Sequence, residues 1–403
     1  MPDIKPLKGL VNRARRLREG HRARHRPTGF GFALADGVDY LDGARWDALT
    51  APHSLFLSRP YLRVLEEAGP ENMRQRYAMI FRGREAVAAV AGQCVTVSAA
   101  RVRKATQRAK LAAPLERVRE RLLVCGNLLS WGMHGVAFAP GEDPSALWPA
   151  VAEALYRLRR ADKLSGDADL VMVKDISDEH AGAAEALSQF SYRALETDPD
   201  MVMEFPAGWR NYDDYLASLT SRYRKVARQI EKDVAAAGCV VEELRDVESR
   251  AAELHGLYMQ THLGARLRLV TLRPEFIPTL AARLGDALRC AVVRRDDQLL
   301  GFVTTVRDGE QAVGYYIGFD RAANAEFPVY FRLLQAVVAD AIRLGCRRLS
   351  LGRTALEPKA RLGARPAPMR VLIRHRIPAL NVLVRGLLHT VSHDEAPQRN
   401  PFK

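Results

Sequence analysis

The chain has 403 residues, of which 48% are hydrophobic, and it carries a formal net charge of +14 at pH 7. This length predicts two or three domains, and the hydrophobic content excludes a disordered or fibrous protein. The positive charge is concentrated in residues 1–30, 101–123 and 353–403, which favours an anionic surface or an anionic substrate as partner.

The cysteines are scattered and form no C-x-x-C pair: Cys94, Cys125, Cys239, Cys290 and Cys346. This pattern predicts neither a disulfide framework nor a zinc site, and it indicates a reducing compartment. The basic N-terminus lacks the continuous apolar run of a secretory signal. The uncharged stretch 122–140 contains glycines and polar residues and is better explained as buried strand and turn than as a membrane span. We therefore expect a cytoplasmic protein without a metal site.

The first half of the chain alternates helical and strand-like patterns. Residues 1–28 are basic and predict a poorly ordered or surface-lying helical arm. A helical pattern runs from Trp46 to Leu65. The apolar runs 77–81 and 86–90 flank a charged turn with a glycine, which predicts a hairpin. We then expect a basic helical insertion at 101–121, strand material up to Phe138, a helix at 144–160 and a buried strand at 169–173.

The second half repeats this order. It begins with a long charged helix over 209–237, followed by a strand at 239–244, a helix at 248–261 and a hairpin over 290–303. The pattern continues with strands at 312–317, 348–351 and 369–373 and with helices at 328–344 and near 355–362. Mixed strands and helices thus recur after about 170 residues, which predicts two copies of one domain.

The predicted fold class is therefore α/β (α+β), with two tandem domains that each contain a mixed sheet flanked by helices. We place the first domain at 29–205 and the second at 206–376, with a boundary near Phe205-Pro206. An amphipathic helix and tail are expected at 377–403.

A set of segments in the second half has a familiar order: strand 314–320, a helix ending at 341–345, strand 349–352, and then 353–363. Together with residues 57–62 and 219–225, this set resembles the FemAB-like branch of the GNAT superfamily over roughly residues 40–375. The resemblance implies tandem GNAT-like domains that transfer an acyl or aminoacyl group from a thioester or tRNA ester to an amine by direct attack. It implies an acyl-CoA or acyl-carrier thioester as co-substrate and no permanently bound cofactor.

The resemblance also places the donor. In GNAT enzymes two central strands diverge beside the thioester, and the next helix presents its N-terminus to the pyrophosphate of coenzyme A. Here strand 312–317 and loop 319–327 take these positions. The usual Gln/Arg-x-x-Gly-x-Gly/Ala loop is absent, and Arg321, Asn324 and Glu326 stand there instead. We assign Arg321 to donor binding, and an aminoacyl or other donor stays open.

Catalytic candidates come from the same half. Lys359 follows strand 348–351, where FemAB-like enzymes carry a lysine near the developing oxyanion; the alternative is a solvated surface lysine. Tyr315 and Tyr316 alternate on a strand, so one is expected in the core and the other toward the donor. We assign Tyr316 to protonation of the leaving group and Tyr315 to donor binding.

Glu357 is assigned as the base that deprotonates the amine; further candidates are His255, His262 and Asp320.

Arginines and lysines supply the remaining candidates. Arg353 follows a strand end and either clamps a phosphate or carboxylate or pairs with Glu357. The helical spacing of Arg222, Arg224 and Lys225, with Arg228 and Lys232, predicts either a solvated charged face or an anion-binding one.

Segment 377–389 is apolar, flanked by arginines and too short to span a bilayer, so it is either an interfacial helix or a helix covering the core. With the other basic segments, it favours peripheral contact with an anionic inner membrane and an amphiphilic amine as acceptor, such as a long-chain amino lipid or a cell-envelope precursor. Two alternatives stay open: a Fem-type aminoacyl-tRNA-dependent transferase in peptidoglycan synthesis, for which tRNA is a partner, and a non-catalytic binding module. No DNA-binding motif is found, and motifs of metalloproteases, serine hydrolases, kinases and dinucleotide-binding dehydrogenases are absent.

Overall fold

The structure is a computed structural model that describes residues 26–98, 119–166, 168–265, 268–377, 380–381, 397 and 399–403. The predicted arm, insertion and amphipathic helix lie outside these residues, apart from a few residues at their ends. Of the insertion, the described residues Arg119–Arg121 begin a strand rather than ending a helix.

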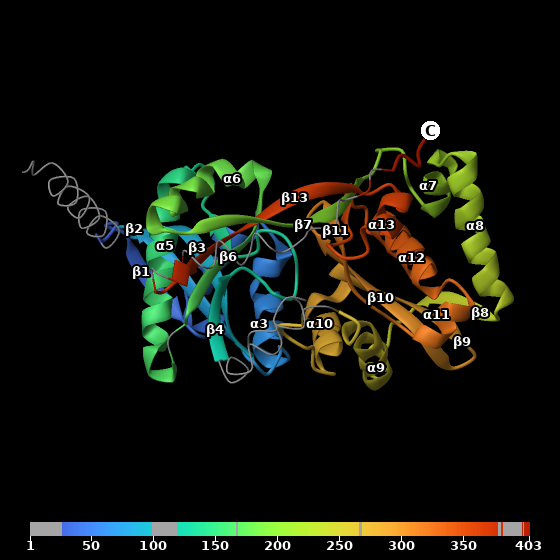
Figure 1. Ribbon diagram of the computed structural model, residues 1–403, viewed down its shortest axis with the longest axis horizontal. Coiled ribbons are helices and arrows are strands. Elements are labelled where there is room, and N and C mark those ends of the chain that lie inside the picture. Colours follow the sequence, from blue (N-terminus) through green and yellow to red (C-terminus); the bar gives the residue numbers. More distant parts are fainter. Residues whose placement is uncertain are drawn as a thin grey trace, which may run out of the picture.

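The first half of the chain contains a mixed set of strands and helices (Figure 1). Its strands are β1 (Gly31–Ala35), β2 (Met73–Arg82), β3 (Glu85–Ser98), β4 (Arg119–Cys125), β5 (Val136–Phe138), β6 (Leu170–Ser177) and β7 (Arg193–Glu204). Its helices are α2 (Gly43–Thr50), α3 (Arg59–Glu67), α5 (Pro144–Ala161) and α6 (Asp178–Ala184).

The second half follows from residue 212. Its helices are α7 (Tyr212–Ser218), α8 (Ser221–Ala236), α9 (Ala251–His262), α10 (Phe276–Leu284), α11 (Arg321–Glu326), α12 (Val329–Arg343) and α13 (Leu356–Leu362). Its strands are β8 (Cys239–Glu243), β9 (Leu288–Arg295), β10 (Gln298–Asp308), β11 (Gln311–Phe319), β12 (Arg348–Ser350) and β13 (Arg365–His375).

The two halves have the same topology. In the first, hairpin β2–β3 is followed by β4, helix α5 and β6, and β4 and β6 pair in parallel. In the second, hairpin β9–β10 is followed by β11, helix α12 and β12, and β11 and β12 pair in parallel. Both predicted hairpins are confirmed, and the shared order of elements supports the predicted duplication.

The sheets of the two halves are joined, contrary to the expectation of one sheet per domain. All strands belong to one sheet in the order β1-β2-β3-β4-β6-β13-β7-β12-β11-β10-β9-β8, with β5 beside β3. Strand β7 leaves the first half to pair with β12, and β13 leaves the second half to pair with β6. The two exchanged strands also pair with each other and cross the middle of the molecule (Figure 1). Each half therefore completes its sheet with the last strand of the other.

Two predicted helices are interrupted. The pattern over 46–65 gives α2 and α3, because Ser58 caps α3 and Pro60 occupies its first turn. The charged helix over 209–237 gives α7 and α8, because the buried Leu219 has extended backbone and the Thr220 N–H donates to Pro401 O of the C-terminal tail (2.9 Å). A contact with residues about 180 positions away thus ends α7, which no local pattern reveals.

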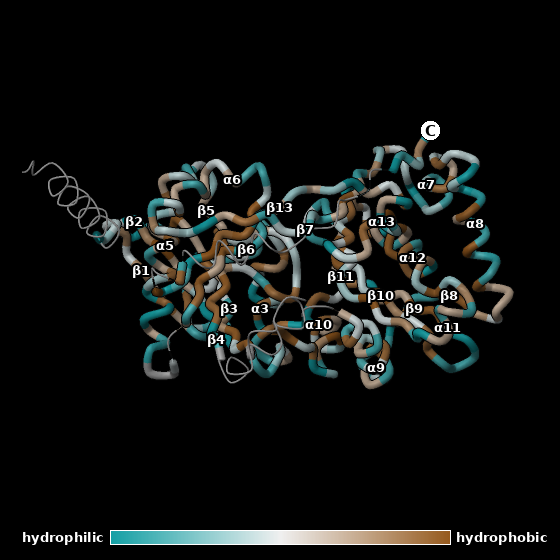
Figure 2. The backbone as a smooth tube through the Cα atoms, viewed as in Figure 1, coloured by the Kyte–Doolittle hydropathy of each residue, from teal (hydrophilic) through white to brown (hydrophobic). Residues whose placement is uncertain are grey.

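Apolar side chains fill the space between the sheet and its helices, and the apolar residues are the brown segments of the tube in Figure 2. Helix α5 packs on the sheet of the first half and α12 on that of the second. A third cluster contains buried residues of both halves, including Phe56 and Phe302. At its centre the hydroxyls of Tyr61 and Tyr315 are hydrogen-bonded (2.7 Å). The two halves therefore share a core.

Candidate active site

The central strands of the second half separate as the family resemblance implies. Strands β11 and β12 pair only from Gln311 with Arg348 to Val313 with Ser350. Strand β11 continues to Phe319, so its edge from Gly314 onward has no pairing with β12. In the first half, β4 ends at Cys125, the residue of its last pair with β6. In the first half it is β6 that runs on past the last pair, to Ser177, whereas in the second half it is β11, the first strand of the parallel pair.

Trp131, from the loop after β4 of the first half, lies where β11 and β12 separate. Its indole N–H donates to Ser350 Oγ at the end of β12. A Cβ atom at Gly352 would lie 3.1 Å from the indole ring, and the ring centroid is 6.3 Å from that of Tyr315 on β11. Gly352 also has φ +78°, so this position requires glycine for two reasons. Trp131 thus closes one side of the gap with an apolar ring.

Lys359 is buried beside the same strand end. It comes from α13, is 4% exposed, and donates to Gly352 O (3.1 Å). Burial lowers the pKa of Lys359 to about 8, and the nearby Asp200 carboxylate opposes that shift. The alternative of a solvated surface lysine is therefore wrong. A single backbone carbonyl engages one N–H of the ammonium group and leaves donors for another acceptor.

Asp200 of the exchanged strand β7 completes this group. It is 4% exposed and accepts hydrogen bonds from Ser350 Oγ (2.6 Å) and from the Gly352 N–H (2.8 Å). Burial raises the pKa of Asp200, whereas these two bonds and the charges of Lys359 and Arg353 lower it. The first half thus supplies a buried carboxylate whose charge acts on the buried lysine.

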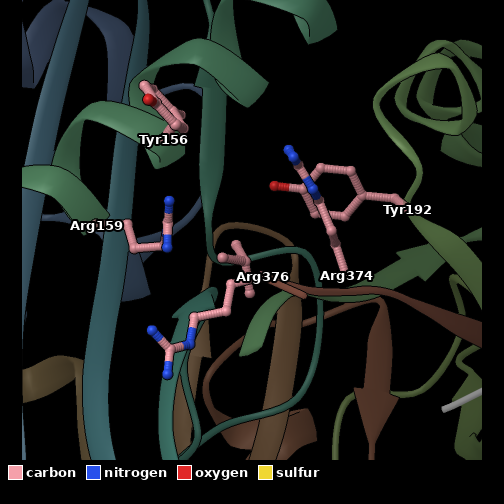
Figure 3. Close-up of a pocket in the computed structure, with 6 residues that line it drawn as sticks. Tyr156, Arg159, Tyr192, Arg374 and Arg376 are labelled. Carbon is pink, nitrogen blue, oxygen red and sulfur yellow. The ribbon is translucent and has the colours of Figure 1, made fainter. Parts of the chain in front are cut away.

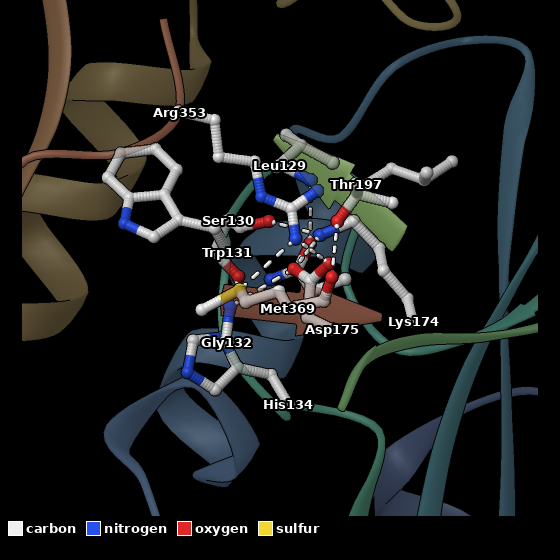
Figure 4. A network of polar contacts seen from close by, with 12 residues as sticks. Leu129, Ser130, Trp131, Gly132, His134, Lys174, Asp175, Thr197, Arg353 and Met369 are labelled. Carbon is white, nitrogen blue, oxygen red and sulfur yellow. Dashed lines mark hydrogen bonds and ion pairs between the residues drawn. The ribbon is translucent and has the colours of Figure 1, made fainter. Parts of the chain in front are cut away.

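A second buried carboxylate, Asp175, connects the halves (Figure 4). It is fully buried at the left-handed φ of 61° and forms ion pairs with Lys174 and Arg353. It also accepts from the Gly132 N–H (3.0 Å), and Lys174 donates to Ser130 O (2.8 Å). Arg353 is therefore held by Asp175 and not by Glu357, the partner considered from the sequence. Its Nε is buried without an acceptor.

The loop after β4 is held at several further points. Asn127 bonds to Tyr61 and Gln93, and Leu129 O accepts from the Tyr316 hydroxyl (3.1 Å). His134 Nδ1 contacts Ser130 Oγ (2.7 Å), and its Nε2 lies 4.0 Å from Asp308 of the second half. Burial lowers the pKa of His134 to about 3, so this imidazole is neutral at physiological pH. These bonds fix Trp131 in the gap.

The two tyrosines lie on β11 as their alternation predicts. Tyr315 is 4% exposed and belongs to the shared core, whereas Tyr316 is half-buried near Tyr258 and Phe276. Burial raises the pKa of both phenols well above 10. Tyr316 therefore keeps its proton at neutral pH.

The proposed base Glu357 lies apart from the buried group around Lys359. Its carboxylate pairs with Arg361 (3.0 Å) and with Arg399 of the tail (3.1 Å). These two bonds lower the pKa of Glu357, which disfavours proton abstraction. Among the other candidates, His255 contacts Leu272 O, His262 contacts Thr271, and Asp320 caps α11.

Helix α8, which carries the predicted basic residues, lies at one end of the molecule (Figures 1 and 2). Arg222, Lys225, Arg228 and Lys232 are exposed and Arg224 is half-buried. In the described part of the chain none of the five has a carboxylate partner. The structure thus separates them from the buried group around Lys359 and leaves their charges available to an anion.

The helix ends that would hold a pyrophosphate are occupied. At the start of α12, the Tyr330 N–H donates to Asn324 Oδ1 and the Val329 N–H to Phe327 O (both 2.8 Å). At the start of α5, the Asp143 carboxylate accepts from the Ser145 N–H (2.9 Å). Arg321 is exposed on α11 nearby. A cavity of about 280 Å³ at this place is lined by Asn324, Ala325, Glu326, Phe327, Pro328, Tyr330 and Phe331, so its lining includes three aromatic residues and no cation.

Sequence reasoning missed Trp131, Asp175, Lys174, Asp200 and Ser350. Two of these carried a signal: Lys174-Asp175 directly follows the apolar run 170–173, and Asp200 precedes the apolar run 201–203. A charge at the end of a buried strand indicates a buried partner. That partner lies in the other half of the chain, and the sequence does not identify it.

Similarity to known proteins identifies the class. Residues 220–360 match the family described as acetyltransferase (GNAT) domain. The fold is similar to the crystal structure of FemX (TM-score 0.55, 10% identity, covering 85% of this chain and 98% of that one). It is also similar to a tandem GNAT protein from the clavulanic acid biosynthesis pathway (TM-score 0.50, 11% identity, 87% and 99% covered). No curated protein matches the sequence.

The protein is therefore an acyltransferase with a FemAB-like, tandem GNAT fold. GNAT acetyltransferases use acyl-CoA as co-substrate. Among the described helices, none is both long and apolar enough to cross a membrane. The described cysteines are buried and free, and the described residues hold no group of His, Cys, Asp or Glu suited to a metal ion.

Proposed function

We propose that the protein is an N-acyltransferase that moves an acyl group from a thioester donor to the amine of an amphiphilic, lipid-like acceptor. The observation that carries this proposal is the buried lysine beside the end of β12, where β11 runs on without pairing to β12. Lys359 is held by Gly352 and balanced by Asp200 at the point where β11 and β12 separate. A fixed cation in a dry site favours a transition state that places negative charge on a carbonyl oxygen.

The reaction is a direct displacement. The neutral amine nitrogen forms a bond to the thioester carbonyl carbon while Lys359 stabilises the resulting oxyanion. The tetrahedral species collapses, the C–S bond breaks, and the thiolate takes a proton. Tyr316 is the proposed source of that proton, because burial keeps its hydroxyl protonated, and the phenolate that forms takes a proton back from water. The amine gives up its own proton. Because the pKa of Glu357 is lowered, this carboxylate is a weak base, and we assign that proton to another acceptor or to water.

The donor is an acyl-CoA or an acyl-carrier thioester. The aromatic cavity at the α11–α12 junction is the proposed place for the carrier arm, with Arg321 beside it. The Asn324 cap on α12 implies that side chains, rather than free helix N–H groups, hold the phosphate end of the donor. An amphiphilic acceptor fits the aromatic side chains Trp131, Tyr258 and Phe276 around Tyr316.

A second candidate is transfer from an aminoacyl-tRNA to a peptidoglycan precursor. The capped start of α12 and the unpaired cations Arg222, Lys225 and Arg228 on α8 favour it, because a nucleic-acid backbone needs distributed positive charge rather than a pyrophosphate cradle.

Two experiments separate these candidates. Retention of radiolabelled acyl-CoA by the purified protein, with no retention of aminoacyl-tRNA, supports the thioester donor; the reverse result supports the second candidate. Comparison of lipids between a deletion strain and its parent then identifies the acceptor. If no amide-bearing lipid disappears in the deletion strain, the lipid-like acceptor is wrong.

A further inference from the structure

Each of the two exchanged strands brings charged side chains into the other half. The end of β13 brings Arg374 and Arg376 to a small pocket of the first half (Figure 3). There Arg376 pairs with Asp169 (2.8 Å), and the Arg374 guanidinium lies 6.0 Å from the centre of the Tyr192 ring, so both arginines have partners within the fold. Strand β7 brings Asp200 into the second half, where its two partners belong to the strand end beside Lys359.

One oxygen of Asp200 acts on the side of the gap that Trp131 closes. Ser350 Oγ donates to Asp200 Oδ2 (2.6 Å), and the indole N–H of Trp131 donates to the same serine oxygen. A carboxylate can only accept, so the single hydroxyl hydrogen of Ser350 points to Asp200 and a lone pair is left for the indole. The carboxylate therefore fixes the direction of the serine hydroxyl, and that hydroxyl holds Trp131.

The other oxygen of Asp200 acts on the buried lysine. Asp200 Oδ1 accepts from the Gly352 N–H (2.8 Å), and Gly352 O accepts from Lys359 Nζ (3.1 Å). The carboxylate thus orients the glycine whose carbonyl holds the ammonium group. Its charge also acts on Lys359 directly, because it opposes the lowering of the lysine pKa by burial.

The remaining charged groups around Lys359 leave this role to Asp200. They pair with one another or are exposed: Glu357 with Arg361 and Arg399, Arg353 with Asp175, and Arg365 on the surface. The charge that raises the pKa of Lys359 is that of Asp200. One carboxylate of the first half is therefore connected both to the aromatic side of the gap and to the lysine.

We propose that Asp200 is a positioning residue that couples acyl-chain selection to catalysis. Through Ser350 it holds Trp131 against the gap, and through Gly352 it holds Lys359 beside the strand end. The first half of the chain thereby controls a reaction that takes place in the second. This inference rests on the proposed acyl transfer, in which Lys359 stabilises the oxyanion.

The test measures amine-dependent thiol release from acyl-CoA by the full-length protein as a function of pH. Asp200→Asn keeps the size of the side chain and removes its charge. The pH above which the rate falls, about 8 in the wild type, should move about one unit lower, because Lys359 loses the negative charge that favours its protonated form. A pH profile equal to that of the wild type would overturn the proposal.

A matched control lies on the same strand. Glu204 ends β7 four residues after Asp200, pairs with Arg348 (3.2 Å), and its side chain is 72% exposed. Glu204→Gln removes one carboxylate from β7 but should leave the pH profile unchanged, because solvent screens its charge. An equal shift in Glu204→Gln and Asp200→Asn would mean that net charge alone moves the profile, and the proposed role of Asp200 would be wrong.

The variant Ser350→Ala separates the two connections. It removes the bond to Trp131 but leaves the charge of Asp200 in place. The preference in kcat/KM should move about threefold toward longer acyl chains, because one hydrogen bond to the indole is lost, while the pH profile stays that of the wild type. An unchanged chain-length preference in Ser350→Ala would contradict the coupling, even if Asp200→Asn does not fold.

A measurement without substrate distinguishes this inference from the proposed function. The pKa of Lys359 can be followed by NMR in protein with ¹³C-labelled lysine, with the signal assigned by its absence in Lys359→Arg. A lower pKa of Lys359 in Asp200→Asn supports the connection even if the wild type transfers no acyl group, in which case only the proposed function is wrong. The same pKa in both proteins overturns the connection whatever the activity.

Discussion

The buried carboxylate of Asp175 gives the sharpest test of how the halves are joined. Replacement by asparagine keeps the size of the side chain but removes the charge that balances Lys174 and Arg353. Lys174 is 11% exposed and Arg353 21%, so neither cation gains full hydration when its partner is lost. Breaking a buried pair in this way costs about 3–5 kcal/mol, a large share of the stability of an ordinary domain.

The assay is unfolding in urea, followed by circular dichroism and tryptophan fluorescence for Asp175→Asn and for Asp178→Asn. Asp178 lies three residues later and pairs with Arg370, but its side chain is 55% exposed, so its loss should cost less than about 1 kcal/mol. Asp175→Asn should lower the unfolding midpoint far more than Asp178→Asn, with both probes reporting the change. If the two variants unfold at the same midpoint, Asp175 does not hold the halves together.

Three further predictions concern other groups of the site. The catalytic rate at saturating acceptor should fall about tenfold per pH unit above about pH 8, because Lys359 loses its proton there. The variant Lys359→Arg should shift that fall to higher pH. A wild-type rate that keeps rising to pH 10 would contradict the cationic role of Lys359. Trp131→Ala should shift the preference toward longer acyl chains by about tenfold in kcat/KM, because the ring closes one side of the gap. An unchanged preference for chain length would show that Trp131 does not contact the acyl chain. The pKa of His134 is about 3 in the folded state and near 6.5 in the unfolded state, so below pH 6.5 only the unfolded state binds the extra proton, and the stability of the fold decreases as the pH is lowered. Between pH 7 and pH 5 the variant His134→Gln should therefore lose about 2 kcal/mol less stability than the wild type. Equal losses in the two proteins would contradict a buried neutral imidazole.

Local patterns predicted the elements that depend on neighbouring residues. The hairpins around Gly83 and around Asp296-Asp297 were readable because apolar runs flank a turn. Helices α5 and α12 could be predicted because their apolar residues recur at helical spacing and form one buried face. The order of these elements was enough to predict the duplication, and the resemblance then placed Lys359 after the last short strand.

Contacts between distant segments were not predictable from the sequence. Asp200 reaches Ser350 across 150 positions only because β7 is exchanged into the sheet of the second half. Trp131 reaches the same serine across 219 positions because its loop is held by Asp175 and Tyr316. The split between α7 and α8 depends on the C-terminal tail. In each case the stabilising free energy comes from packing and strand pairing between the halves, and local propensity does not predict it.

We propose that an acyl group passes from a thioester to an amine in the gap between β11 and β12, with Lys359 beside it. The most direct measurement is thiol release from acyl-CoA by the purified protein, with and without a long-chain amine, combined with mass spectrometry of the amide. We expect release that depends on the amine, one amide per thiol, and a rate lowered about 10²–10³-fold in Lys359→Met. Thiol release that ignores the amine, or an undiminished rate in Lys359→Met, would contradict the account.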